Sequence, residues 1–170
     1  MIDHRPLILT AEAEPFAAAR FDALRRAYFP PERNQLAAHI TMFHALPGSE
    51  CDAVLRQVAA AARGLTPIEV EASGLRSLGR GVALTLRSEA LAALRADLAH
   101  SFAGVLTAQD AQGWRAHVTV QNKVTSAVAR ATLAALSAGF VPWHFRVTGV
   151  GVWRYDGGPW ELVKVIGLRA

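Results

Sequence analysis

The sequence contains little that would permit covalent cross-linking or insertion into a membrane. It has one cysteine, Cys51, which excludes an internal disulfide and a metal cluster held by several thiolates. No apolar run reaches 18 residues, and Leu7-Ile8-Leu9 near the start is too short to be the core of a signal peptide. We therefore expect a cytoplasmic protein with no membrane partner.

Blocks of like charge and low-complexity segments are also lacking. The 18 Lys and Arg residues exceed the 14 Asp and Glu residues, for a formal net charge of +4. This mild excess favours an anionic partner through its long-range field, without identifying one. Because 52% of the 170 residues are hydrophobic, the chain can bury a sizeable core. We expect one domain over 1–170 and a monomer.

The sequence instead contains two copies of the same predicted order of secondary-structure elements. Apolar periodicity predicts strand, helix, strand, helix, strand over 6–10, 14–28, 37–46, 52–63 and 68–72, and again over 82–86, 89–102, 116–120, 126–137 and 145–150. A last strand, 160–168, follows an Asp-Gly-Gly turn. The pattern predicts a duplicated, bilobal α+β fold with internal repeats at about 6–75 and 81–168. Two lobes related by a pseudo-twofold axis would line a central cleft with antiparallel or mixed sheets and carry helices outside.

Two His-x-Thr triplets stand in equivalent strands of the two halves. His39 and Thr41 occupy alternate positions of one strand, and His117, with Thr119 two residues on, follows His39 by 78 residues. Side chains alternate across a strand, so each pair projects from one face while the apolar residues between them anchor the strand in a core. We expect the two faces to converge on one cleft.

The recurrence of the triplet is not explained by composition. With six His and nine Thr, a His-x-Thr triplet arises by chance roughly 0.3 times, so that two occur in only a few per cent of shuffled sequences. Ser73-Gly74-Leu75 and Thr148-Gly149-Val150 repeat with nearly the same period, 75 residues. We expect equivalent backbone turns or bulges there.

Two imidazoles that face one phosphodiester can divide the proton transfers of its cleavage. A neutral ring takes the proton of the attacking oxygen, and a protonated ring gives one to the leaving oxygen. The hydroxyls of Thr41 and Thr119 can donate hydrogen bonds to the non-bridging phosphate oxygens. This scheme needs no metal, and the sequence has no His-Glu-x-x-His, Cys-x-x-Cys or clustered Asp/Glu motif. We expect neither a metal nor another cofactor.

The chain resembles the 2H phosphoesterase superfamily, which includes the 2′-5′ RNA ligase-like proteins and the RNA cyclic phosphodiesterases. The resemblance rests on His39-Ile-Thr-Met and His117-Val-Thr-Val, supported by residues 42–48, 121–124 and 155–163. It implies a bilobal α+β fold with a central cleft, and hydrolysis of 2′,3′-cyclic phosphates to 2′-phosphates or reversible 2′-5′ ligation. The substrates would be RNA 3′ ends or small cyclic nucleotides.

The resemblance also implies roles for four residues: His39 and His117 would be catalytic, and Thr41 and Thr119 would bind phosphate. Five other side chains near the motifs are candidates for substrate contacts: Phe43, Arg80, Arg115, Lys123 and Tyr155. The basic residues would contact phosphate or ribose, and the aromatic ones would stack on a base. We expect Phe43 on the face of His39 and Thr41, and His44 on the opposite face in a structural or surface role.

Two rival functions stay open at this stage. One is a non-catalytic RNA- or nucleotide-binding regulatory module that uses the same cleft to bind phosphates. The other is a phosphodiesterase for small molecules that never contacts RNA. An ATP-driven ligase is disfavoured because no Gly-x-x-x-x-Gly-Lys motif exists, and Cys51 has no sequence sign of an activating base.

Overall fold

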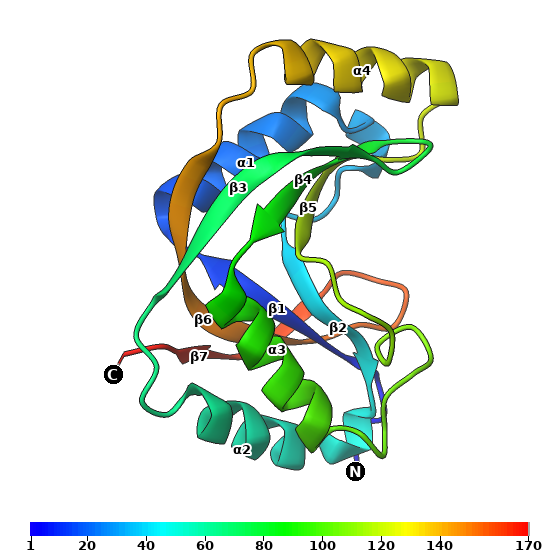
Figure 1. Cartoon of the computed structure of the whole chain (residues 1–170). Helices are drawn as coiled ribbons and strands as arrows, with labels where there is room; N and C mark the ends of the chain where they lie inside the picture. Colours follow the sequence, from blue (N-terminus) through cyan, green and yellow to red (C-terminus); the bar gives the residue numbers. More distant parts are fainter. Residues whose placement is uncertain (170) are drawn as a thin grey trace.

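A computed structural model describes residues 1–169 and contains a seven-stranded sheet with four α-helices in that part of the chain (Figure 1). The first half runs β1 (Leu7–Ala13), α1 (Pro15–Tyr28), β2 (Ile40–Leu46), α2 (Cys51–Ala62) and β3 (Ile68–Ser77). The second half runs β4 (Val82–Arg87), α3 (Glu89–Ser101), β5 (His117–Gln121), α4 (Ser126–Ala138) and β6 (Trp143–Arg154), followed by β7 (Glu161–Gly167). Two 3₁₀ turns, η1 (Pro31–Arg33) and η2 (Gly48–Glu50), lie on either side of β2. The predicted element order and the α+β class are confirmed.

The sheet order is β2-β1-β6-β3-β4-β5, with β7 also paired to β6, and these pairings are antiparallel. Each half gives its third strand to the other half, because β6 pairs with β1 and β3 pairs with β4. The long β6 pairs with β3 near its start and with β1 and β7 further along. It therefore joins two wings of the sheet, one of β3, β4 and β5 and the other of β1, β2 and β7. We propose that this strand exchange makes residues 1–170 one folding unit.

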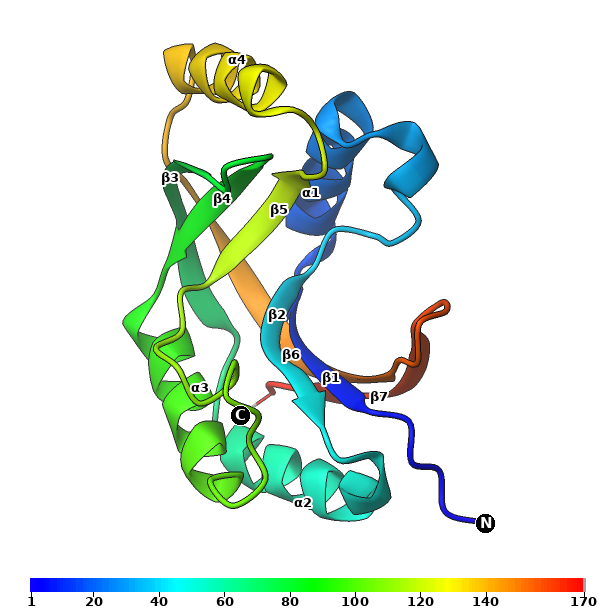
Figure 2. The same cartoon turned by 90° about the vertical axis from the view of Figure 1, so that its right-hand side faces the viewer.

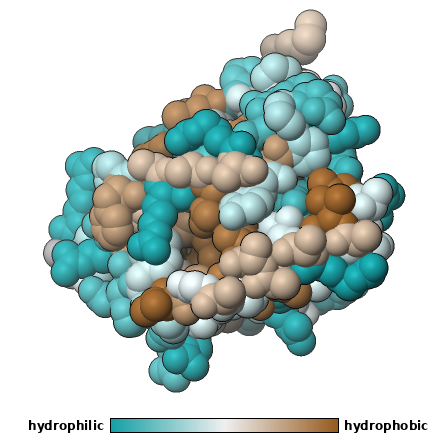
Figure 3. All heavy atoms as spheres, turned by 90° about the horizontal axis from the view of Figure 1, so that it is seen from above, coloured by the Kyte–Doolittle hydropathy of each residue, from teal (hydrophilic) through white to brown (hydrophobic). Residues whose placement is uncertain are grey.

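The helices cover the two wings at opposite ends of the molecule (Figures 1 and 2). Helices α1 and α4 pack on the wing of β3, β4 and β5, while α2 and α3 pack on one another at the other end. Local sequence signals explain where three of the helices begin. Pro15 lies in the first turn of α1, Ser88 caps α3 by accepting a hydrogen bond from the Leu91 amide (3.1 Å), and Thr125 caps α4. The surface of the molecule on the side of α1 and α4 contains a hollow, with hydrophobic side chains around it (Figure 3).

Two bulges interrupt the sheet at equivalent places. The register of β3 with β4 shifts at Ser73, and the register of β6 with β1 shifts at Thr148. Both expected bulges are therefore confirmed.

Within residues 1–169, no helix is both long and apolar enough to cross a membrane.

Candidate active site

The two predicted histidines stand at corresponding positions and share one local geometry. His117 is the first residue of β5, and His39 directly precedes β2. In each ring Nδ1 lies 2.9 Å from the carbonyl oxygen two residues earlier, that of Ala37 for His39 and that of Arg115 for His117. An Nδ1–H that donates to this carbonyl fixes the tautomer and leaves Nε2 as the nitrogen that exchanges protons.

Burial lowers the pKa of both imidazoles, because desolvation disfavours their charged form. The backbone hydrogen bonds oppose this effect, and nearby positive charges add to it. The charge of His117 acts on His39, and that of His44 acts on both. His44 and His117 line one cavity, and His39 lines another. A lowered pKa supplies the neutral imidazole that a general base requires.

The two threonines lie half-buried on the strands where they were expected. Thr41 lines a cavity together with His117. The Thr41 carbonyl accepts a hydrogen bond from Trp114 Nε1 at 2.9 Å, so the segment before β5 is fastened to β2. The Thr119 carbonyl accepts one from Arg25 Nη1 at 3.0 Å, so α1 is fastened to β5. These bonds fix both His-x-Thr strands from their backbones.

Buried arginines support the histidine strands in both halves. Arg25 in α1 and Arg95 in α3 are 5% and 6% exposed. Arg95 Nε donates to the Met42 carbonyl at 2.8 Å, just as Arg25 donates to β5, so each helix supports the histidine strand of the other half. Sequence reasoning missed both residues, although each occupies an apolar-face position four residues after a core side chain, Phe21 or Leu91.

A bulge in β2 decides which side chains reach the site. The register of β2 with β1 shifts between Thr41 and Phe43, which makes Met42 an extra residue. Met42 and Phe43 therefore both point into the core, each 0% exposed, and His44 emerges beside Thr41. Two predictions from strict alternation are wrong: Phe43 does not share the face of Thr41, and His44 does. A bulge reverses alternation beyond it.

Phe43 is thus a core residue and offers no surface to a base. Its ring packs edge-on against Phe102 with 5.4 Å between centroids, and the Arg95 guanidinium lies 4.0 Å from its centroid.

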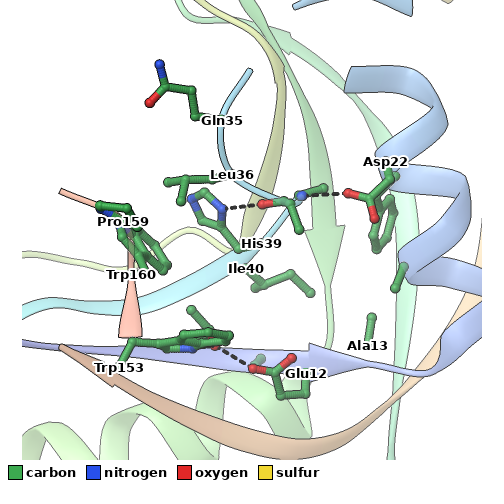
Figure 4. Close-up of a pocket in the computed structure, with 16 residues that line it drawn as sticks. Glu12, Ala13, Asp22, Gln35, Leu36, His39, Ile40, Trp153, Pro159 and Trp160 are labelled. Atoms are coloured by element: carbon green, nitrogen blue, oxygen red, sulfur yellow. Dashed lines mark hydrogen bonds between the residues drawn. The ribbon is translucent and has the colours of Figure 1, made fainter. Parts of the chain in front are cut away.

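An aromatic cavity of about 380 Å³ opens beside His39 (Figure 4). The His39 ring points toward Trp160, with 4.6 Å between centroids, and Trp153 lies 6.1 Å from Trp160. Phe21 of α1 also lines this cavity. Aromatic side chains grouped in this way suit a planar, uncharged ring. Tyr155, a predicted contact, is 39% exposed and lies 6.2 Å from Trp160, at the rim of this aromatic group.

The same cavity contains a half-buried carboxylate, that of Glu12. Trp153 Nε1 donates to Thr10 Oγ1 at 2.8 Å, and Thr10 Oγ1 donates to Glu12 Oε1 at 2.8 Å. Burial raises the pKa of Glu12, and the hydrogen bond from Thr10 opposes that rise. Gly151 makes room for the cluster, because a Cβ there would collide with the Glu12 carboxylate. No pattern in the sequence pointed to this group.

A second, polar cavity of about 330 Å³ lies beside His117. Thr41, His44, Arg76 and Arg115 line it with that histidine. Arg115, a predicted contact, therefore lies at the site, where its carbonyl also orients His117. Arg76 was missed, because the strand was expected to end before it, whereas β3 continues to Ser77.

The structure does not bring Arg80 and Lys123 to either cavity beside the histidines. Arg80 lies in the turn between β3 and β4, where its Nε donates to the Val124 carbonyl at 3.0 Å. Lys123 is exposed after β5 with a φ of 63°. Both side chains therefore lie at the surface, outside these two cavities. Among residues 1–169, no group of three or more His, Cys, Asp or Glu side chains is arranged to hold a metal ion.

Comparisons with solved structures agree with this fold. The crystal structure of TT0787 of Thermus thermophilus is similar with a TM-score of 0.68 and 14% identity, over 97% of this chain and 98% of that one. E. coli LigT complexed with 3′-AMP is similar with a TM-score of 0.65 and 18% identity, over 99% and 100% of the two chains. A structure described as a phosphoesterase gives 0.65 and 16%, over 99% and 100%. At these identities the likeness establishes the fold.

No curated protein matches the sequence significantly. The family model described as the 2′-5′ RNA ligase superfamily, in contrast, matches residues 13–159. Because that match covers most of the chain and includes both His-x-Thr strands, the protein belongs to the 2′-5′ RNA ligase superfamily of 2H phosphoesterases.

Proposed function

We propose that the protein is a metal-independent phosphodiesterase that opens 2′,3′-cyclic phosphates on RNA 3′ ends or small cyclic nucleotides. The observation that carries this proposal is the matched geometry of His39 and His117. Each ring uses Nδ1 on a backbone carbonyl and keeps Nε2 for proton exchange, and burial lowers the pKa of both. Formation of a 2′-5′ linkage would use the same groups, with the 5′-hydroxyl of an RNA chain in place of water as the attacking oxygen and O3′ again as the leaving group.

In the proposed reaction, water attacks the phosphorus while one neutral imidazole takes its proton at Nε2. The P–O3′ bond breaks, and the other imidazole, protonated, gives its Nε2 proton to the leaving O3′. The product is a 2′-phosphate. The hydroxyls of Thr41 and Thr119 donate to the non-bridging oxygens, where charge is redistributed in the transition state. In the reverse direction the two histidines exchange roles.

The surroundings of the histidines support a nucleotide substrate. The aromatic cavity beside His39 has tryptophan rings that could pack against a base, and the polar cavity beside His117 has arginines that could bind a phosphate. The structurally similar LigT has been solved with 3′-AMP and with phosphate. We extend nucleotide binding to this chain on the basis of the shared fold and these two cavities.

The experiment is hydrolysis of a 2′,3′-cyclic mononucleotide and of an oligonucleotide with a cyclic phosphate end, both in EDTA. Phosphorus NMR of the product should give a 2′-monophosphate in both cases, with turnover unaffected by the chelator. If the purified protein binds these compounds but never turns them over, the regulatory binding module is the better description. A 3′-phosphate product would contradict the proposed choice of leaving oxygen.

A further inference from the structure

The polar cavity contains a histidine that the proposed mechanism does not use. His44 Nδ1 lies 3.0 Å from Asp110 Oδ1, and the His44 side chain is 42% exposed. Asp110 is 1% exposed. Its carboxylate also accepts the backbone amides of His44, at 2.9 Å, and of Ala45, at 3.1 Å. A buried carboxylate therefore fixes the ring through Nδ1–H, which leaves Nε2 as the available nitrogen in the cavity.

An arginine in the same cavity carries an unsatisfied donor. Arg76 Nε is buried and has no hydrogen-bond partner within residues 1–169. A buried, unpaired N–H of a charged group is unfavourable, and an anion in the cavity would relieve that cost. Arg115 lines the cavity beside it. The three cationic or potentially cationic side chains come from β2, β3 and the segment before β5.

Among the described residues that line the cavity, one carboxylate stands against three arginines and His44. Asp110 is the acidic residue in its lining, and its oxygens already accept from His44 and Ala45. Arg95 also reaches the cavity, where it donates to the Met42 and Asp110 carbonyls. The cavity beside His39 is the opposite, since its described lining includes Glu12 and Asp22 but neither Arg nor Lys. The two sides of the histidine pair thus differ in charge.

We propose that the polar cavity is a second phosphate subsite, in which His44, Arg76 and Arg115 bind a phosphate other than the one that reacts. This inference rests on the proposed function and deepens it. The preferred substrate carries at least two phosphates: the cyclic phosphate between His39 and His117, and a second one on the His117 side. The uncharged base then faces the aromatic cavity. The second phosphate comes either from a 5′-phosphate or from the phosphodiester of an RNA chain.

Matched variants separate this role from a structural one. His44→Asn keeps an amide N–H that can donate to Asp110 in place of Nδ1–H, but removes the nitrogen equivalent to Nε2. Arg76→Met removes the unsatisfied guanidinium and keeps an apolar stem on β3. Arg80→Met removes one charge of the same sign from the β3–β4 turn, outside the cavity. It is the control for net charge.

The kinetic test compares KM for three substrates: a nucleoside 2′,3′-cyclic phosphate, the same compound with a 5′-phosphate, and a dinucleotide with a cyclic phosphate end. The second phosphate should lower KM of the wild type about tenfold or more. His44→Asn and Arg76→Met should each reduce that advantage, and Arg80→Met should keep it. An advantage with both longer substrates assigns the subsite to any phosphate, and one with the dinucleotide alone assigns it to a phosphodiester.

A binding measurement keeps the inference independent of turnover. Calorimetry of the wild type with adenosine 2′-monophosphate and adenosine 2′,5′-bisphosphate should show tighter binding of the bisphosphate, and the preference should shrink in His44→Asn and in Arg76→Met. Failure of hydrolysis with this preference intact would sink the proposed function and keep the subsite. Equal affinities in the wild type, or a preference that both variants retain, would overturn the subsite even in an active enzyme.

Discussion

At the start of both β2 and β5 a histidine donates Nδ1–H to a carbonyl two residues earlier, and a half-buried threonine follows two residues later. Both strands then carry an extra residue, Met42 in one and Val120 in the other, where their register with the neighbouring strand shifts. After that point they diverge. β5 ends at Gln121, whereas β2 continues to Leu46.

The extension of β2 places His44 in the polar cavity and ties it to Asp110. The equivalent position after β5 is Asn122, whose side chain accepts the amide of the next residue at 2.9 Å. Duplication therefore supplies two similar His-x-Thr units, for which we propose a catalytic role. The unequal ends of the two strands make the cavities on either side of the histidine pair different. Similar halves account for the proposed chemistry, and the dissimilar ends account for how a substrate is oriented.

The largest expected effect tests the equivalent part of the two strands. His39→Ala or His117→Ala should each lower kcat about 10²–10⁴-fold, because each removes one of the two proton transfers. Steady-state hydrolysis of a 2′,3′-cyclic nucleotide measures both. His100→Ala, on the exposed side of α3, is the matched control. If one histidine variant kept wild-type turnover, the two strands would not share the chemistry.

A somewhat smaller effect is expected at the threonines. Thr41→Val and Thr119→Val keep the shape and the β-branch but lose the donor to the phosphate, and removal of one such donor costs about 10²–10³-fold in kcat. The two losses should be similar, since the hydroxyls occupy equivalent positions. Thr85→Val on β4 serves as the control. A loss confined to KM would place the hydroxyls in ground-state binding instead.

The buried arginines that hydrogen-bond to the two histidine strands should contribute to the free energy of unfolding. Arg25→Met and Arg95→Met each leave at least one backbone carbonyl without its donor, at a cost of about 1–3 kcal/mol in the free energy of unfolding. Arg95 should cost more, because it donates to two backbone carbonyls, whereas Arg25 donates to one backbone carbonyl and to the side-chain Oδ1 of Asn34. Urea unfolding measures both variants. A gain in stability would mean that the cost of burying the guanidinium exceeds what its hydrogen bonds contribute.

The smallest effect concerns pH. Burial lowers the pKa of His39 and of His117, and the scheme needs one ring neutral and one protonated. Rising pH removes the single proton and falling pH adds a second. The profile of kcat/KM should therefore be a bell whose alkaline limb lies below the ordinary imidazole value of about 6.5, with limbs that belong to the pair. A rate independent of pH would count against the two-imidazole scheme.

Replacement of His44 sharpens the same measurement. The charge of His44 lowers the pKa of both His39 and His117. His44→Asn should therefore move both limbs of the bell to higher pH. Unmoved limbs would mean that His44 does not act on the pair.

Much of this arrangement could be predicted from the sequence, because its signals are periodic. Apolar spacing predicted the order of elements, and the repeat of His-x-Thr pointed to His39 and His117. A bulge has no such signal: nothing in Thr41-Met-Phe-His shows that alternation reverses after Met42. Phe43 was therefore expected in the cleft and His44 outside it.

Long-range contacts were hidden for a different reason. Asp110 lies 66 residues from His44 in the sequence. The exchange of β3 and β6 between the halves depends on packing between distant segments, which the pattern of neighbouring residues does not show. Arg76 was missed because β3 was expected to stop short of it. Residues brought together by tertiary structure were thus the ones that sequence reasoning could not place.

The central claim, that His39 and His117 act as one unit, is tested most directly by a double-mutant comparison in EDTA. We predict that the His39→Ala/His117→Ala protein is scarcely less active on a 2′,3′-cyclic nucleotide than either single variant, because loss of one partner already abolishes the coupled proton transfers. If the two losses in kcat multiply instead, or if either single variant turns over like the wild type, the two histidines work independently and the account is contradicted.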